Sequence, residues 1–261
     1  YLLDLENRKE LNFAYENGAD YNPGIAFTAA STIKIPIMVS AFRRLSEPIP
    51  QDAANLLLQM IKESENPPAD SLMQTYFDPN IGPIYVTNDM RELGLSNTFL
   101  AGHFYPGAPL LQRYLTPANQ RLDYNTDPDV YNQTTPADMG MLLDDIYQCA
   151  QMGGGTFFAV FQGEISQSEC QLMVTYLTQN KIGVLIQAGL PDGTQFAHKH
   201  GWVVETDGVI HTILDAGIVF SPGGNYVVVI AMHQPTQLIF DNANLLFAQI
   251  STAIYNYFNI Q

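Results

Sequence analysis

Positive charge is scarce in this chain of 261 residues. It has 11 Lys and Arg against 26 Asp and Glu, which gives a formal net charge of −15 at pH 7. Nucleic-acid binding needs Lys and Arg to neutralise phosphates, and an anionic membrane surface repels a chain of the same sign. The composition therefore argues against nucleic acid and acidic membranes as partners. The ordinary structural role of this surplus acidity is solubility.

Long apolar runs and cysteines are also lacking. No stretch of eighteen apolar residues occurs, so we expect no membrane span. Only Cys149 and Cys170 could form a disulfide, and their spacing leaves open whether they pair or remain buried thiols. The numbering begins at Tyr1 without a signal peptide, and we expect a mature chain that is secreted or periplasmic. Hydrophobic residues make up 46%, an ordinary share for a folded domain.

Strand-like segments lie at both ends of the chain, and helical periodicity fills the middle. Residues 1–16 predict two short strands around a turn, and residues 31–180 are mostly helical. Four further strands are expected at about 183–188, 196–205, 209–220 and 225–233. A last amphipathic helix should bury a face that consists of Ile239, Ala243, Leu246, Ile250, Ile254 and Tyr257.

This order of elements predicts an α/β fold of the α+β kind. An antiparallel sheet built from both chain ends would be flanked by helices, with an all-helical lobe inserted. We expect residues 1–27 and 181–261 to form the sheet lobe and residues 28–180 the helical lobe. The functional site should lie in a cleft between the two lobes.

Lys34 is the only charged residue of the apolar segment 28–38, and it follows Ser31 by three positions. On a helix, two such side chains lie on one face, one turn apart. Apolar neighbours would lower the pKa of the lysine, so that neutral Lys34 could accept the proton of the Ser31 hydroxyl. The alternative is a helix N-cap serine and a lysine whose stem lies along apolar surface.

Two further short motifs follow in the chain. Ser64-Glu65-Asn66 ends one helical segment and opens the next, and its ordinary interpretation is a helix-end turn. Lys199, within "HKHGW", is expected on a strand and is the last Lys or Arg of the chain. Its ordinary role would be to protect an edge strand from aggregation.

In this order, the S-x-x-K, S-x-N and K-x-G motifs resemble the signature of the penicillin-recognising serine hydrolases, and class A β-lactamases in particular. The segments "GIAFTAASTIKIPIM", "TTPADMGMLL" and "GTQFAHKHGWV" resemble that family's nucleophile helix, the helix after its Ω loop and its catalytic-edge strand. The resemblance covers most of the chain. It implies the fold of that family.

The resemblance also implies catalytic roles. Ser31 would be the acylated nucleophile, Lys34 its base or proton relay, and Ser64 the donor of a proton to the leaving nitrogen. Lys199 would supply positive potential near Ser64 and the substrate carboxylate. Glu65 departs from the usual Asp, and the gap between Ser31 and Ser64 is shorter than in class A enzymes, so the site should be more open.

Substrate-binding roles follow from the same resemblance. Asn66 would bind the substrate's amide side chain, Gly201 would leave room beside the strand, and the backbone N–H of Trp202 would join that of Ser31 in the oxyanion hole. His200 replaces the Thr or Ser of K-T-G, and its imidazole could donate to the substrate carboxylate. Because no Lys or Arg follows Lys199, His211 is a candidate for the family's missing cation.

Residues 97–134 lack periodicity and are expected to form a long irregular loop. The family places a glutamate here, in an E-x-x-L-N motif, to activate the deacylating water. This loop contains no Glu, and Asn119 or Gln120 falls near the expected place. Its only carboxylates are those of Asp123, Asp127 and Asp129. Without a positioned base, hydrolysis of the acyl-enzyme should slow, since such a base contributes roughly 10²–10⁴-fold.

Four interpretations remain open. They are a β-lactamase-like hydrolase with slow deacylation, a penicillin-binding or peptidase-like site for peptidoglycan peptides, a non-catalytic ligand-binding scaffold, and a metal site built from His198, His200 and a third histidine. The paired Ser31/Lys34 and Ser64/Asn66 motifs favour the first. We therefore expect weak β-lactam hydrolysis through an acyl-enzyme, without cofactor or metal, by a monomer that takes a β-lactam or peptidoglycan-like substrate.

Overall fold

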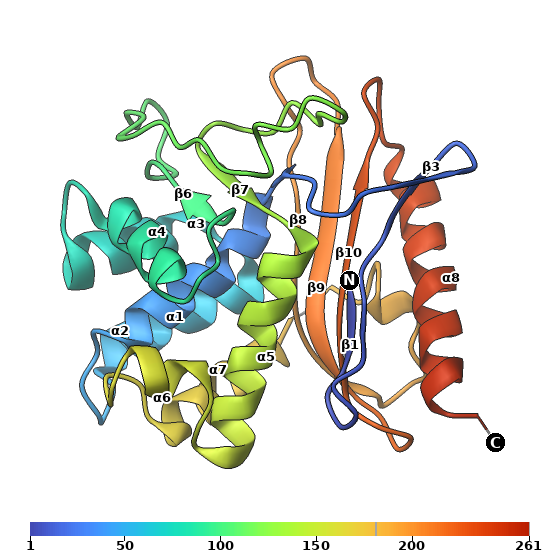
Figure 1. Cartoon of the computed structure of the whole chain (residues 1–261). Coiled ribbons are helices and arrows are strands. Elements are labelled where there is room, and N and C mark those ends of the chain that lie inside the picture. Colours follow the sequence, from blue (N-terminus) through green and yellow to red (C-terminus); the bar gives the residue numbers. More distant parts are fainter. Residues whose placement is uncertain (181, 261) are drawn as a thin grey trace.

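A five-stranded antiparallel sheet runs through the computed structural model, which describes residues 1–180 and 182–260 (Figure 1). The strand order is β2-β1-β10-β9-β8, so the N-terminal strands lie beside the C-terminal ones. The strands are β1 (Leu2–Asp4), β2 (Glu10–Leu11), β8 (Gln195–Trp202), β9 (Thr212–Phe220) and β10 (Tyr226–His233). The predicted sheet built from both chain ends is confirmed, and β8 is an edge strand.

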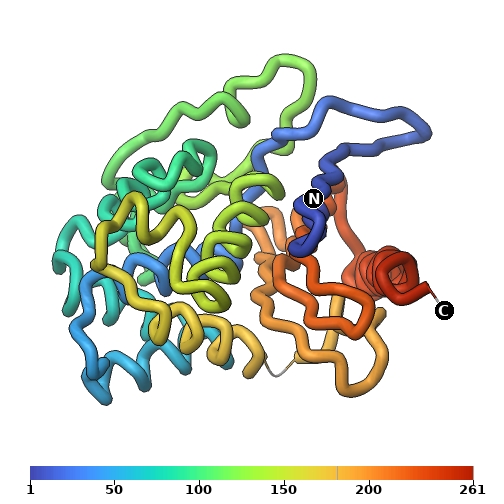
Figure 2. Tube along the Cα trace, turned by 60° about the horizontal axis from the view of Figure 1, so that its bottom comes forward, coloured from blue at the N-terminus to red at the C-terminus, as the bar shows by residue number. Residues whose placement is uncertain are grey.

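Helices cover both faces of this sheet. The C-terminal helix α8 (Phe240–Phe258) lies alone against one face, and α5 (Pro136–Met152) lies against the other (Figure 1). The remaining helices gather on the α5 side, as Figure 2 shows. They are α1 (Lys34–Phe42), α2 (Gln51–Leu58), α3 (Asn66–Leu72), α4 (Gly82–Glu92), α6 (Thr156–Val160) and α7 (Gln167–Leu177). Within residues 1–180 and 182–260, no helix combines the length and apolarity needed to cross a bilayer.

Helix α1 is the centre of the helical part, because all nine of its residues are buried. A short 3₁₀ turn, η1 (Ala30–Ile33), leads into it and carries Ser31. The start of α5 is confirmed as predicted, since the Thr135 hydroxyl accepts the backbone N–H of Asp138 over 3.1 Å. A disulfide between Cys149 and Cys170 joins α5 to α7, which answers the question that the spacing left open.

The long loop is tied to the segment that precedes Ser31. Short strands β5 (Phe27–Thr28), β7 (Asn132–Thr134) and β6 (Phe99–Leu100) form a small antiparallel sheet with β7 in the middle. A separate hairpin consists of β3 (Ala14–Glu16) and β4 (Ala19–Tyr21). The division into a lobe of 1–27 plus 181–261 and a lobe of 28–180 stays an interpretation. Residues 181 and 261, which bound it, lie outside the described residues.

One expected strand is wrong. The structure has no strand at 183–188 and forms a 3₁₀ turn, η4 (Gln187–Gly189), at its end. The apolar residues Leu185 and Ile186 are buried in a cluster of core side chains, but their backbone does not pair in a strand ladder. Leu185 has φ 58°, its N–H donates to the Asn244 side chain, and the N–H of Ile186 donates to Asp215. These side-chain acceptors take the two backbone N–H groups that would otherwise donate to a neighbouring strand.

The buried face of α8 also differs from the prediction. Ala243, Phe247 and Ser251 are buried, whereas Leu246 and Tyr257 are 47% and 56% exposed. The helical period was read correctly, but the stripe that meets the sheet is rotated from the predicted one. Packing partners decide this rotation, because the helix carries apolar residues on more than one side.

Candidate active site

Lys34 binds three oxygen atoms that converge at the start of α1. Its Nζ lies 2.9 Å from Ser31 Oγ, 2.7 Å from the backbone O of Ser64 and 2.8 Å from Asn66 Oδ1. The backbone and amide oxygens can only accept hydrogen bonds. A neutral amine has two N–H groups for these acceptors, so its lone pair is left for the Ser31 hydroxyl. The predicted meeting of the two side chains is confirmed.

The protonation of Lys34 is balanced near neutrality. The side chain is fully buried, and this burial lowers its pKa to about 7. The positive charge of Lys199 lowers that pKa further, whereas the charge of Asp70 raises it. Both forms of the amine are therefore populated at physiological pH, as a general base requires.

Ser64 joins the site through its main chain. It follows a π-helical turn, η2 (Gln59–Glu63), and adopts a left-handed conformation with φ 61° and ψ 25°. This conformation is uncommon for residues other than glycine. It ends the helix, and the carbonyl of Ser64 accepts a hydrogen bond from Lys34. Asn66 then opens α3 and adds its side-chain oxygen.

The edge strand β8 passes very close to the turn that carries Ser31. A Cβ added to Gly201 would lie 2.6 Å from the backbone N of Ser31 and 2.9 Å from that of Thr32. Only a glycine permits this approach. Lys199 precedes Gly201 on the same face of the strand and is fully buried. Burial lowers the pKa of Lys199 to about 8, although Asp215 raises it, and Nζ donates to the backbone O of His200 over 3.1 Å.

The imidazole of His200 lies on the other face of β8, away from Lys199 and Gly201. The ring is 3% exposed and meets Trp202 edge-on at 4.9 Å between centroids. Trp202 in turn packs against Phe240 of α8. Burial lowers the pKa of His200 to about 4, so the ring is neutral above pH 5. The alternation of side chains along a strand separates this histidine from the Ser31 and Lys34 side chains.

His211 and His198 each have hydrogen-bond partners outside the site. His211 Nε2 lies 2.7 Å from Asp207 and Nδ1 lies 3.0 Å from the backbone O of Gln234. The hydrogen bond to Asp207 raises the pKa of His211. His198 Nδ1 lies 2.9 Å from Asp215 Oδ1. In the described part of the chain, no three His, Cys, Asp or Glu residues are grouped to hold a metal ion, so the metal interpretation lacks a ligand set.

The loop residue that faces Lys34 is Phe104, not Asn119 or Gln120. Lys34 Nζ lies 5.7 Å from the Phe104 ring centroid. Asn119 instead stabilises the loop, since its Oδ1 accepts the N–H of Thr116 and its Nδ2 donates to Gln133 Oε1, each over 2.9 Å. The loop group beside the lysine is thus an aromatic ring and not a carboxylate.

Asp70 is a charged residue of the site that the sequence interpretation missed. It lies in α3 four positions after Asn66, so both side chains share one helix face. Its Oδ1 accepts the backbone N–H of Phe104 over 2.8 Å, and burial raises its pKa. The i, i+4 spacing from Asn66 could have identified Asp70. No local signal identifies Phe104.

The chain is similar to a known protein family and to several solved structures. The model of the β-lactamase enzyme family matches residues 51–258. A structure of PBP-A is 20% identical to this chain, and a leucine-to-glutamate mutant of PBP-A, solved as an acyl-enzyme complex with penicillin G, is 21% identical. Both have a TM-score of 0.67, and each alignment covers 100% of this chain and 89% of the PBP-A chain. TLA-3 extended-spectrum β-lactamase is 17% identical with a TM-score of 0.70, over 98% of this chain and 90% of its own. No curated protein matches the chain.

At these identities the solved structures show the fold, which is that of β-lactamases and related transpeptidases. The family match begins after Ser31 and Lys34 and includes the motifs around Ser64 and Lys199. Ser31 and Lys34 thus lie outside the matched segment, whereas Ser64, Asn66 and Gly201, which lie against them, are inside it. With four-fifths of its length matched, the chain belongs to the β-lactamase enzyme family.

Proposed function

We propose that this protein is a β-lactamase-type serine hydrolase that opens β-lactam amides through an acyl-enzyme on Ser31. The observation that carries the proposal is the contact between Lys34 Nζ and Ser31 Oγ, with the other two positions of the amine occupied by acceptors. A neutral Lys34 in this arrangement can only accept a hydrogen from Ser31. That is the arrangement of a nucleophile with its general base.

Acylation would proceed in balanced steps. The Ser31 oxygen attacks the lactam carbonyl carbon while its proton moves to Lys34, and the backbone N–H groups of Ser31 and Trp202 bind the oxyanion. The C–N bond then breaks, and the ring nitrogen takes a proton through the Ser64 hydroxyl. Asn66 keeps its Nδ2 for the carbonyl of the substrate's side chain, because its Oδ1 is held by Lys34. Lys199 adds positive potential for the substrate carboxylate.

Deacylation should be the slow half of the cycle. Water attack on the ester needs a base, and the loop group beside Lys34 is the apolar ring of Phe104. Asp70 has one carboxylate oxygen committed to the Phe104 N–H. Loss of a positioned base costs roughly 10²–10⁴-fold in rate. We therefore propose an acyl-enzyme that persists.

An intact-mass time course with penicillin G tests this function, run beside a chromogenic cephalosporin assay. We expect one adduct per chain, mapped to the peptide that contains Ser31, and slow release of product. Ser31→Ala should fold and form no adduct. If neither adduct nor product forms, the protein is a non-catalytic scaffold. Fast product without an adduct would contradict slow deacylation.

A second candidate is a penicillin-binding or peptidase-like enzyme that acts on peptidoglycan peptides. The ring of Phe104 favours it, since a site without a water-activating carboxylate suits transfer of the acyl group to an amine. Acylation by peptides that end in D-Ala-D-Ala, in the presence of an amine acceptor, would support it over hydrolysis. The Cys149–Cys170 disulfide suits a secreted or periplasmic protein. Action as a monomer remains part of the proposal.

A further inference from the structure

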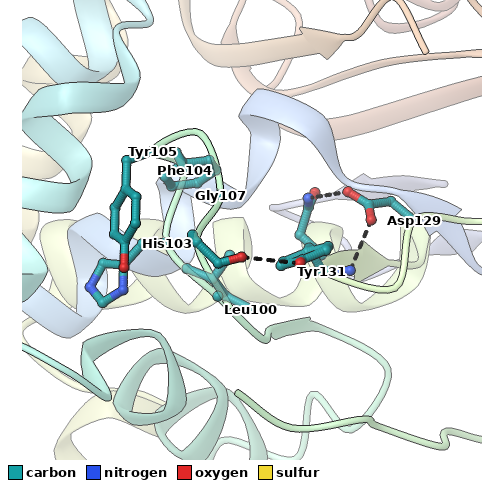
Figure 3. Close-up of a pocket in the computed structure, with 10 residues that line it drawn as sticks. Leu100, His103, Phe104, Tyr105, Gly107, Asp129 and Tyr131 are labelled. Carbon is teal, nitrogen blue, oxygen red and sulfur yellow. Dashed lines mark hydrogen bonds between the residues drawn. The ribbon is translucent and has the colours of Figure 1, made fainter. Parts of the chain in front are cut away.

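A cavity of ≈ 300 Å³ lies within the long loop, next to the residue that faces Lys34. Its walls come from the loop around Phe104 and from the approach to β7, and Figure 3 shows Asp129 and Tyr131 on one side with His103 and Tyr105 on the other. Asp129 and Asn132 are among the residues that line it. The proposed acylation steps do not use this space.

Asn132, which lines the cavity, carries a buried acceptor that no described residue satisfies. Asn132 is 8% exposed, and its Nδ2 donates to Asp129 Oδ2 over 3.0 Å. A carboxylate requires a donor here, so the orientation of the amide is settled by this bond. The other amide atom, Oδ1, is buried and has no hydrogen-bond partner among residues 1–180 and 182–260. A buried unpaired acceptor is costly unless a ligand or water satisfies it.

The charge in the cavity is negative and unbalanced. Asp129 accepts the backbone N–H of Tyr131 over 2.9 Å, and within the described chain it forms no ion pair with Lys, Arg or His. Burial raises the pKa of this carboxyl group. Burial raises the pKa of Glu205, His211 lowers it, and the charges of Asp207, Asp129 and Asp127 raise it further. A cation would relieve this local excess of acid.

The cavity is close to the nucleophile. Phe104 lines it and also faces Lys34 at 5.7 Å. The backbone O of Asn132 accepts the N–H of Ala29 over 3.3 Å, two residues before Ser31. A group that extends from a substrate on Ser31 past Phe104 would therefore enter this space.

We infer that the cavity is a subsite for a primary ammonium group at the end of the substrate's acyl side chain. The ammonium donates a hydrogen bond to Asn132 Oδ1 and faces the carboxylate of Asp129. Hydrogen-bond acceptors and one uncompensated negative charge suit an alkylammonium and reject a carboxylate or a bare alkyl end. This inference rests on the proposed acylation of Ser31.

Matched pairs of penicillins test the subsite. Each pair carries acyl chains of equal length that end in –CH₂NH₃⁺ or –CH₂CH₃, over a series of three to six carbons, so that reach is varied together with charge. We measure the second-order rate constant of acylation by intact mass at pH 7, where an alkylammonium is fully charged. For at least one length, the ammonium member should react about tenfold faster, the effect of one charge-assisted hydrogen bond. In Asp129→Asn this preference should fall to near one, with the alkyl member unchanged.

Asp127→Asn is the matched control, because it makes the same charge change in the same loop at an exposed residue that does not line the cavity. It should keep the preference. In the wild type, butylammonium chloride should slow acylation by the ammonium-ended penicillins only. This measurement tests the subsite if Asp129→Asn does not fold. Equal rates for all wild-type pairs would overturn the subsite, as would a preference that survives in Asp129→Asn. Thermal stabilisation by butylammonium without any preference would mean that the cavity binds free amines only, which also overturns it. No acylation by any penicillin would instead refute the proposed function.

Discussion

The Phe104 ring lies 5.7 Å from the ammonium nitrogen of Lys34, on the side of the lysine that the loop covers. An aromatic face attracts an ammonium group, but it cannot accept a proton. The hydrogen bond from the Phe104 N–H to Asp70 Oδ1 holds the loop in this position. If Ser31 is acylated as proposed, this pair leaves no proton acceptor on the loop side of Lys34, and we expect the ester to persist.

The first prediction concerns this ring. Phe104→Glu should place a carboxylate beside Lys34 and accelerate deacylation, by up to the roughly 10²–10⁴-fold that a general base contributes. The lifetime of the penicillin adduct, followed by intact mass, measures the change.

Leu115→Glu is its control. Leu115 is 68% exposed in the same loop, four positions before Asn119, so this variant adds a glutamate to the loop at an exposed position. We expect no shorter lifetime in this variant. If Leu115→Glu accelerates deacylation and Phe104→Glu does not, Phe104 does not occupy the position of the base.

The second prediction is a pH dependence of acylation. Because burial lowers the pKa of Lys34 to about 7, the amine is protonated and inactive as a base at lower pH. The acylation rate should rise about tenfold per pH unit up to about 7 and level off above it. His200, with a pKa of about 4, should add nothing to the profile between pH 5 and 8.

Lys34→Arg separates charge from basicity. Arginine stays protonated, so its side chain can fill the site but cannot take the Ser31 proton. Acylation should fall by roughly 10²–10⁴-fold. A flat wild-type profile from pH 5 to 8, or an active arginine variant, would show that another group is the base.

The third prediction concerns the approach of β8 to Ser31. In Gly201→Ala, the new Cβ would stand 2.6 Å from the Ser31 backbone N, so the strand has to move away. Displacing the Trp202 N–H from the oxyanion should reduce acylation by roughly 10²–10³-fold. Gly154→Ala is the control, because a Cβ there meets no atom within 4 Å. Equal acylation rates in both variants would exclude β8 from the oxyanion hole.

The fourth prediction concerns stability. The disulfide between Cys149 and Cys170 closes a loop with a sequence separation of 21. Replacing both cysteines by alanine should lower the free energy of unfolding by about 3 kcal/mol through the loop-closure entropy of the unfolded chain. Urea denaturation measures this loss, and a reductant should produce the same shift in the wild type. An unchanged urea midpoint would mean that the disulfide contributes nothing to stability. The acylation rate should be the same with and without the disulfide.

Features that depend on neighbouring residues could be read from the sequence. The spacing of Ser31 and Lys34 placed both on one turn, Thr135 began its helix, and the order of apolar segments predicted the antiparallel sheet. Each depends on helical or strand periodicity and on local hydrogen bonds. The stretch at 183–188 misled the prediction because an apolar run is compatible with a strand and with a buried loop alike.

The chain by itself thus determined the antiparallel architecture and the pairing of a serine with a lysine one turn away. Tertiary structure alone decided that Phe104 faces Lys34, that His200 turns to the α8 side of β8, and that Asp129 and Asn132 border a cavity that Phe104 also lines. The physical reason is the range of the interactions. Periodicity acts between residues a few positions apart, whereas these contacts join segments that only the packing of the whole chain brings together.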